Sequence, residues 1–164
     1  HVYIGMSTKD AAYLAQPGDV LVVDSCGLRD TSSFGGMAAS LYQKLELSGA
    51  IVWGAVRDIP AIAEAQFPVW AGAQTCMTGK YRICASEING PVSISGVLVQ
   101  PGDVVIADGS GICIVAPEAV DEVVRRLLET KRAEDAMQAL ISGKGSIDAI
   151  RAADRPQYKS HNER

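Results

Sequence analysis

Short apolar runs that alternate with helical patterns constrain the fold more than any other feature of this 164-residue sequence. Three such runs have the length of buried strands, and they occupy residues 20–24, 50–53 and 68–71. Helices are predicted between them, at residues 36–47 and 58–64. This order is typical of a parallel sheet with crossover helices, so the sequence predicts an α/β fold.

Turn and cap residues set the limits of these elements. A Pro-Gly turn at residues 17–19 introduces the first strand, and residues 25–36 carry the glycines and serines of a loop. Asp58 is expected to cap the second helix. The first helix is expected to bury a face made of Met37, Ala38, Leu41 and Leu45.

The pattern changes after residue 71. An antiparallel or barrel-like section is predicted from four short strands separated by Gly and Pro turns, at residues 82–88, 91–98, 103–107 and 111–115. Pro117 and Glu118 then open a long helix that is expected to reach Ile141. We therefore divide the chain into a domain at residues 1–141 and a polar C-terminal tail at residues 142–164.

One short sequence recurs. Gln16-Pro-Gly-Asp-Val20 returns as Gln100-Pro-Gly-Asp-Val104, and each copy precedes an apolar strand that ends in an aspartate. Pro-Gly-Asp is a convenient way to open a strand, and a duplicated half-fold is the alternative interpretation.

Composition narrows the range of functions. The net charge of −4 gives no reason to expect a nucleic-acid partner, and no apolar run is long enough to cross a membrane. No leader sequence is visible and the four cysteines form no CxxC pair, so buried free thiols in a reducing cytoplasm are expected. The two histidines, His1 and His161, lie near the ends, which argues against catalytic triads and histidine metal sites.

Two short segments are the candidates for chemistry. Arg57 and Asp58 follow the second strand, where open α/β sheets place ligand groups, although a helix cap and a surface ion pair would account for them equally well. The first helix begins at Gly35, Gly36, Met37 and Ala38, and free backbone N–H groups at a helix start suit a carboxylate or an enolate oxygen. Loop flexibility is the structural alternative for the two glycines.

The two segments are more specific together than apart. In a strand–helix–strand unit, the helix start at Gly36 and the strand end at Arg57 fall on the same edge of the sheet. Arg57 and the amides of residues 36–38 can then converge on one anionic ligand. Asp58 can hold a divalent cation whose other positions are filled by water, as Mg²⁺ accepts.

The ordered motifs resemble those of a known family. They are residues 17–24 (PGDVLVVD), Gly36, residues 54–58 (GAVRD), residues 96–108 (GVLVQPGDVVIAD) and Gly111. From about residue 11 to residue 135, the chain is similar to the RraA-like family. That family includes the class II 4-hydroxy-4-methyl-2-oxoglutarate and 4-carboxy-4-hydroxy-2-oxoadipate aldolases, and also the regulator of ribonuclease activity A.

The resemblance implies a β/β/α fold related to the phosphohistidine swivelling domain, assembled as homotrimers or homohexamers with sites between subunits. It implies that Asp58 binds Mg²⁺ or Mn²⁺ and that Arg57 is the catalytic residue, which binds the substrate and stabilises a pyruvate enolate. The backbone of residues 35–38 would hold the pyruvyl carboxylate. A Lewis acid, a guanidinium and fixed amide dipoles together suit enolate stabilisation.

Two features depart from the family pattern. Aldolases of this family usually carry an acidic residue 21 positions before the arginine, where this chain has Gly36, so the usual base for retro-aldol cleavage is missing. Decarboxylation of oxaloacetate demands less, because CO₂ leaves without removal of a hydroxyl proton. Family members also have a longer segment before the first strand, so the N-terminal part of the family domain is expected to be missing here.

The leading hypothesis is a divalent-metal-dependent lyase, of the aldolase or oxaloacetate decarboxylase type, that acts on a pyruvate-containing 2-oxo acid. One alternative is a non-catalytic protein that regulates a ribonuclease or another partner. The other is an enzyme on the same scaffold whose substrate is larger. A methyltransferase is not expected, because the first strand is not followed by a glycine-rich loop of the kind that holds S-adenosylmethionine.

Overall fold

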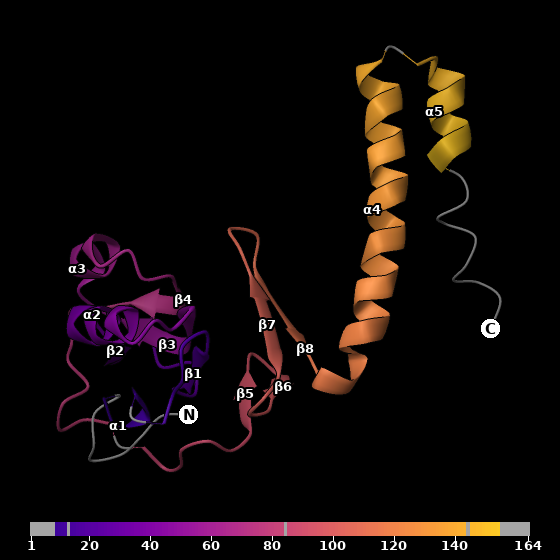
Figure 1. The fold of residues 1–164 in the computed structure, drawn as a ribbon. Coiled ribbons are helices and arrows are strands. Elements are labelled where there is room, and N and C mark those ends of the chain that lie inside the picture. The colour runs from indigo at the N-terminus through magenta and orange to yellow at the C-terminus, as the bar shows by residue number, and fades with distance from the viewer. Residues whose placement is uncertain (1–8, 13, 84, 144, 155–164) are drawn as a thin grey trace. The chain divides into compact units, whose positions relative to one another are not determined.

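The computed structural model describes residues 9–12, 14–83, 85–143 and 145–154. The chain forms two compact units that divide between Ile114 and Val115, and Figure 1 traces both in chain order. The first described element is a short helix, α1 (Lys9–Ala12). Among the helices that the structure describes, none is long and apolar enough to cross a membrane.

The first unit is built on a four-stranded parallel sheet with β3 (Gly49–Val56) at its centre. β1 (Val20–Asp24) pairs with the first part of β3, and β2 (Ser32–Phe34) pairs with its end. β4 (Val69–Gln74) pairs with β3 over nearly its whole length. The predicted parallel α/β arrangement is therefore confirmed.

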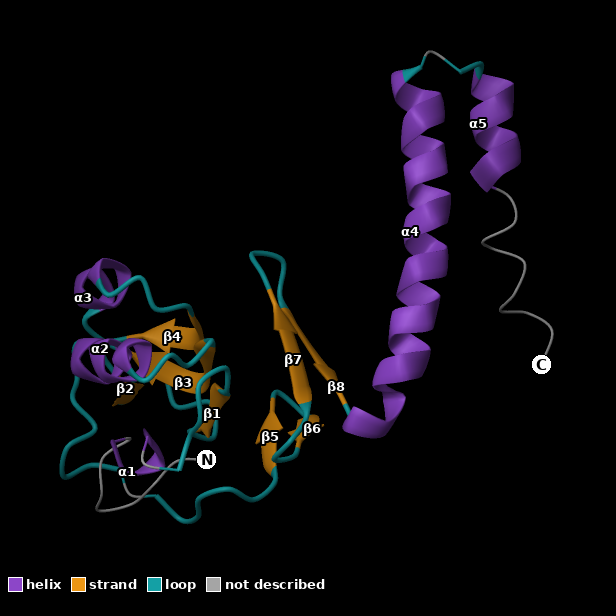
Figure 2. Ribbon diagram, viewed as in Figure 1, coloured by secondary structure: helices purple, strands orange, loops and turns teal. Residues whose placement is uncertain are grey.

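Two helices, α2 (Gly36–Lys44) and α3 (Ile59–Glu64), lie beside this sheet (Figure 2). The rings of Phe34, Tyr42 and Phe67 stack on one another in the core, with centroids 6.1 to 6.3 Å apart. Val23 and Val52 of the sheet belong to the same buried cluster. Because this core ties α2 to the strands, the N-terminus of α2 is held at a fixed place.

The buried face of α2 differs from the predicted one. Its buried side chains are Ala38, Ala39 and Tyr42. Met37 is 75% exposed and Leu45 is 36% exposed, so the prediction that these two residues belong to the core was wrong. The small alanine side chains let the helix approach the sheet closely, and the Tyr42 ring fills the remaining space.

Several element limits also differ from the prediction. α2 ends at Lys44 rather than near residue 47, and Glu46 adopts a left-handed φ of 60° just beyond it. β2 lies within residues 25–36, for which a loop is predicted, because a three-residue strand is too short to show a period of two. β3 continues through Gly54, where an added Cβ would lie 2.6 Å from the Ser25 Cβ.

The described residues after β4 form two separate two-stranded sheets, one of them antiparallel as the sequence predicts. β5 (Val92–Ile94) pairs antiparallel with β6 (Val97–Val99), and β7 (Val104–Ala107) pairs with β8 (Ile112–Val115). The predicted strand at residues 91–98 is divided by a turn in which Ser95 and Gly96 have positive φ. Of the predicted strand at residues 82–88, the described residues form a turn and an isolated bridge.

The recurring sequence folds into the same turn twice. The Gln16 N–H donates to Asp19 Oδ2 at 2.8 Å, and the Gln100 N–H donates to Asp103 Oδ2 at 2.8 Å. The glycine inside each turn has a left-handed φ, of 92° at Gly18 and 95° at Gly102. Identical hydrogen bonds at both places show that Pro-Gly-Asp is a defined strand opener in this fold.

The similarity continues past the two strands. Cys26 N–H donates to Asp24 Oδ1, and Ser110 N–H donates to Asp108 Oδ1, both at 2.7 Å. The backbone N–H groups of Ser110 and Gly111 lower the pKa of Asp108. The structural repeat thus covers a strand with the turn on each side of it, which favours the duplication interpretation more than the short sequence motif does.

Exposed thiols replace the expected buried ones. Cys26, Cys76 and Cys113 are all exposed, because the first two follow strand ends in loops and the third lies on the β7–β8 pair. Cys84 lies outside the described residues.

The second unit consists mainly of the predicted long helix. α4 (Val120–Ser142) follows a short 3-10 turn, Pro117–Ala119, and α5 (Ile147–Asp154) runs beside it (Figure 1). No described residue of α4 is buried. Hydrogen bonds from Arg125 and Arg126 lower the pKa of Glu122 to about 2. Long exposed helices of this kind keep their shape partly through such pairs one turn apart.

Candidate functional site

The C-terminal ends of three strands meet at one edge of the sheet. α2 begins just after β2, Arg57 and Asp58 follow β3, and Thr75 follows β4. The Arg57 N–H donates to Phe34 O and the Thr75 N–H donates to Val56 O, both at 3.0 Å. The start of α2 and the Arg57-Asp58 pair therefore lie together, at the edge where parallel sheets commonly bind ligands.

Asp58 connects the two predicted segments directly. Its Oδ2 accepts the Gly36 N–H at 3.3 Å and lies 3.3 Å from Arg57 Nε. The backbone of Asp58 is left-handed, with φ of 59° and ψ of 41°. Asp58 precedes α3 as predicted, but it makes no side-chain cap bond there, because its carboxylate turns toward the N-terminus of α2 instead.

Arg57 presents part of its guanidinium to solvent. Its side chain is 35% exposed, Nε contacts Asp58, and Nη1 donates to Ser32 Oγ at 3.0 Å. Among the described residues, none accepts a hydrogen bond from Nη2. A guanidinium has five N–H donors, so this side chain retains donors for an anionic ligand.

Gly35 is required by the close approach of the Arg57-Asp58 pair. A Cβ added to Gly35 would lie 2.9 Å from Asp58 Oδ2 and 3.0 Å from Arg57 Cγ. A side chain at position 35 would therefore displace the side chains of the Arg57-Asp58 pair, so the glycine has a packing reason besides loop flexibility.

Gly36 has a different neighbour. An added Cβ would lie 2.6 Å from the Cβ of Ala61 on α3 and 3.3 Å from the Cβ of Asp58. Contacts this short do not occur between real carbon atoms, so any side chain at position 36 requires α3 to move. The close packing of α2 against α3 thus explains why position 36 carries no acidic side chain.

The other two residues of the predicted helix start, Met37 and Ala38, differ in whether their backbone N–H groups are free to bind a ligand. The Ala38 N–H already donates to Gly35 O at 3.0 Å. Met37 lies in the first turn, where backbone N–H groups have no acceptor within the helix. The Gly36 N–H is also engaged, by Asp58 Oδ2 at 3.3 Å, so Met37 is the better placed of the predicted amide donors.

The chemistry of the site fits a single hard cation held by Asp58. The side chain is 47% exposed, and Oδ1 has no hydrogen-bond partner among the described residues. No group of three or more His, Cys, Asp or Glu side chains gathers in the described part of the chain. Magnesium needs only one or two protein carboxylates when water and substrate oxygens supply the other positions.

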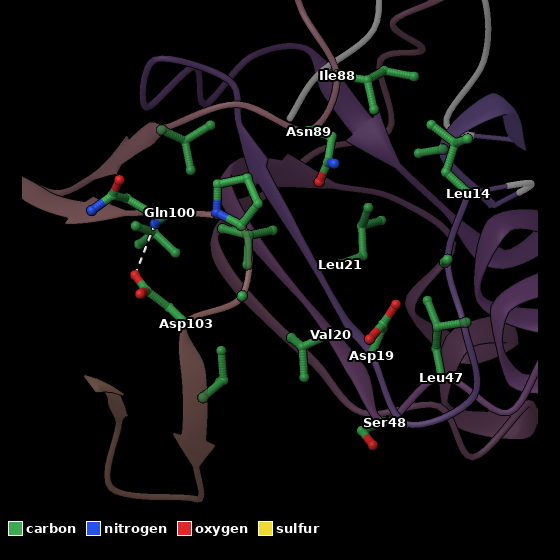
Figure 3. A pocket seen from close by; sticks show the side chains of 18 of the residues that line it. Leu14, Asp19, Val20, Leu21, Leu47, Ser48, Ile88, Asn89, Gln100 and Asp103 are labelled. Carbon is green, nitrogen blue, oxygen red and sulfur yellow. Dashed lines mark hydrogen bonds between the residues drawn. The ribbon is translucent and has the colours of Figure 1, made fainter. Parts of the chain in front are cut away.

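Two hollows of the first unit lie away from the predicted site residues. One of about 520 Å³ is lined by residues around the start of β1 and by the second Pro-Gly-Asp turn, including Asp19, Leu47 and Asp103 (Figure 3). Another of about 730 Å³ is lined mainly by apolar residues, including Trp53 and Trp70. None of the predicted site residues lines either of these two hollows.

Ser32 is the contact residue that sequence reasoning misses. It lies within the stretch of glycines and serines that is predicted as a loop, and no motif or spacing marks it. Only the pairing of β2 with the end of β3 brings its hydroxyl to the Arg57 guanidinium.

A protein-family model matches the part of the chain that contains the candidate site. The model described as RraA-like, Aldolase/RraA, matches residues 5–114, which include β1–β7 and every predicted site residue. The match covers most of the chain, so it extends well beyond the Arg57-Asp58 motif.

Two curated relatives are matched over different shares of their own length. A Halalkalibacterium halodurans protein named "Putative 4-hydroxy-4-methyl-2-oxoglutarate aldolase" is 34% identical over 148 residues, covering 90% of this chain and 69% of that protein. The Legionella pneumophila protein DlpA is 27% identical over 132 residues, covering 80% of this chain but only 22% of DlpA.

A solved structure has the same fold. It is Streptomyces coelicolor RraAS2, described as an unusual member of the RNase ES inhibitor RraA protein family. The TM-score is 0.76 at 28% identity, and the match covers 80% of this chain and 67% of the other. The mixed α/β fold predicted from the sequence is thus an RraA fold.

Proposed function

Because this chain belongs to the RraA-like family, we propose that it is a divalent-metal-dependent lyase that acts on a 2-oxo acid with a pyruvyl group. The observation that carries the proposal is the convergence of Arg57, Asp58 and the Gly36 N–H through contacts of 3.3 Å. The relative named as an aldolase supports a lyase of this kind.

The proposed roles follow from charge and exposure. Arg57 and the amides at the start of α2 bind the carboxylate and the keto oxygen of the substrate. Asp58 holds the divalent cation, Mg²⁺ or Mn²⁺, which supplies Lewis-acid stabilisation when bound. These groups together favour an enolate over the starting keto acid, because they oppose the charge that develops on its oxygen.

Decarboxylation suits these residues better than retro-aldol cleavage. In oxaloacetate the bond between C3 and C4 breaks, and its electron pair forms the C2–C3 double bond of the pyruvate enolate as CO₂ leaves. A proton from water then adds to C3. No step requires a carboxylate at position 36, where Ala61 leaves no room for one.

The test is pyruvate release from oxaloacetate and from 4-hydroxy-4-methyl-2-oxoglutarate with Mg²⁺, followed by reduction of the pyruvate with lactate dehydrogenase. We expect release from oxaloacetate above the metal-only rate, and a fall in kcat/KM of about a hundredfold or more in Asp58→Ala. Glu118→Ala, which removes an exposed carboxylate, is the control and is expected to match the unsubstituted protein. Equal rates in Asp58→Ala and the control would refute the site assignment.

A second candidate is a non-catalytic interaction protein. It is favoured by Gly36 and by the likeness to RraAS2, which is described as belonging to an RNase ES inhibitor family. This candidate predicts no turnover and a stable complex when the chain is used to pull down an RNase ES-type enzyme. Metal-dependent turnover without complex formation would reject it.

The third possibility, a larger substrate accommodated at position 36, has less support. Ala61 already occupies the space beside Gly36, so the missing side chain makes room for α3 and not for a ligand.

We further propose that the chain forms a homotrimer or homohexamer, since α4 exposes several large apolar side chains.

A further inference from the structure

Ser32 is a buried hydroxyl in direct contact with the candidate site. It begins β2 and is only 1% exposed. Its Oγ donates to Met77 O at 2.7 Å and accepts a hydrogen bond from Arg57 Nη1 at 3.0 Å. A buried hydroxyl that links a charged side chain to a backbone carbonyl satisfies both of them, and it restricts how each can move.

The direction of the two bonds is fixed. A serine hydroxyl has one proton to donate, and that proton lies on the bond to Met77 O. Toward Arg57 the oxygen therefore presents only lone pairs, which match a guanidinium donor. Met77 O accepts the Ser32 N–H as well, at 3.0 Å, so backbone and side chain of Ser32 hold the same carbonyl.

Ser32 is itself held on two sides. On one side it pairs with Ala55 of β3, and on the other it forms an isolated bridge with Thr78. Gly79 packs so closely on Ser32 that an added Cβ would run into the Ser32 carbonyl oxygen. A side chain whose backbone is confined in this way provides a rigid support for a neighbouring functional group.

We infer that Ser32 is a positioning residue for Arg57, an inference that rests on the proposed function of that arginine. Asp58 contacts Nε and Ser32 contacts Nη1, so two of the three guanidinium nitrogens are engaged. The plane of the group is thereby set, and the Nη2 donors face an anionic 2-oxo acid in one orientation. Without Ser32, Asp58 alone would leave the guanidinium free to rotate about its long side chain.

The inference is tested with Ser32→Ala and a control one residue further along β2. Ser33 Oγ is buried without a hydrogen-bond partner in the described part of the chain, so Ser33→Ala removes a hydroxyl that makes no hydrogen bond there. The first readout is the Kd of oxalate, a mimic of the pyruvate enolate, measured by calorimetry with Mg²⁺. We expect oxalate to bind roughly tenfold more weakly to Ser32→Ala, and with unchanged affinity to Ser33→Ala.

The second readout needs neither ligand nor turnover. The ¹⁵N relaxation of the Arg57 Nε–H group, assigned by its loss in Arg57→Lys, reports how ordered the guanidinium is. We expect its order parameter to fall in Ser32→Ala and to stay the same in Ser33→Ala. A protein that fails to release pyruvate but shows this fall would refute the proposed function and leave the positioning role supported.

An unchanged Arg57 order parameter in folded Ser32→Ala would overturn the inference, whatever the activity. If Ser32→Ala does not fold, Ser32→Cys takes its place, because the thiol keeps the shape of the side chain and is only a weak acceptor. The same fall in order is then expected, and its absence is equally decisive.

Discussion

At the scale of single residues, Arg57 and Asp58 are neighbours that are held by different means. Arg57 is fixed through its backbone N–H to Phe34 and through its side chain to Ser32. Asp58 lies in the left-handed region, which aspartate tolerates better than most non-glycine residues. That conformation turns its carboxylate toward the start of α2, so the unusual backbone is what joins the two parts of the site.

We predict that Arg57→Lys lowers kcat/KM for oxaloacetate by about a hundredfold. Lysine keeps the charge but loses the planar fork, so it cannot contact Asp58, Ser32 and a substrate at the same time. Steady-state pyruvate release with Mg²⁺ measures the effect. Arg82→Lys, at an exposed turn position, is the matched control. Loss of the same size in both variants would show that the effect is not specific to Arg57.

At the scale of elements, the contact between α2 and α3 decides what the site can contain. Gly36 of α2 lies close against Ala61 of α3, and both residues are small. Helices that pack through small residues approach closely, and a single methyl group added at the contact overpacks it and destabilises the fold. The close contact brings Asp58, which directly precedes α3, to the N-terminus of α2.

We predict that Gly36→Ala lowers the free energy of unfolding by about 1–3 kcal/mol, because the new Cβ meets the Ala61 Cβ. Urea denaturation measures the change. Gly109→Ala is the control, since a Cβ at Gly109 meets nothing within 4 Å.

Adding Ala61→Gly to Gly36→Ala should recover part of the loss, because it removes the atom that the new methyl group meets. A cost in Gly36→Ala no greater than in Gly109→Ala would contradict the proposed packing.

At the scale of the whole molecule, the aromatic and aliphatic core lies between the β1–β4 sheet and its two helices. No described residue of α4 is buried. On α4 the apolar side chains of Val124, Leu127 and Leu128 form one stripe at helical spacing, and the two leucines are 54% and 53% exposed. Apolar stripes of this kind usually mark a surface that another chain covers.

We predict that the chain is a homo-oligomer in solution, with a molar mass of three or six times 17.3 kDa by light scattering. Leu127→Glu should reduce this mass toward that of the monomer, because a charge in an apolar interface is left unpaired. Thr130→Glu, a polar replacement on the same helix, should not. An unchanged mass in Leu127→Glu would place the subunit contacts elsewhere.

The order of strands and helices could be predicted because it depends on local patterns. Apolar runs mark β1, β3 and β4, and Pro117 with Glu118 marks the start of the helical segment that α4 continues. The prediction failed where a local pattern is absent or ambiguous. β2 is too short to show a period, and Met37 and Leu45 are apolar residues that the tertiary packing leaves outside.

The sequence by itself determined that Arg57, Asp58 and the start of α2 share one sheet edge, because the alternation of strands and helices implies parallel strands whose ends coincide. Only the tertiary structure decided how that edge is arranged. Ser32 meets Arg57 across 25 residues of chain, and Gly36 meets Ala61 because two helices pack together. Such contacts change with shifts of about a few tenths of an ångström between segments far apart in sequence, and no local pattern of residues encodes positions this closely.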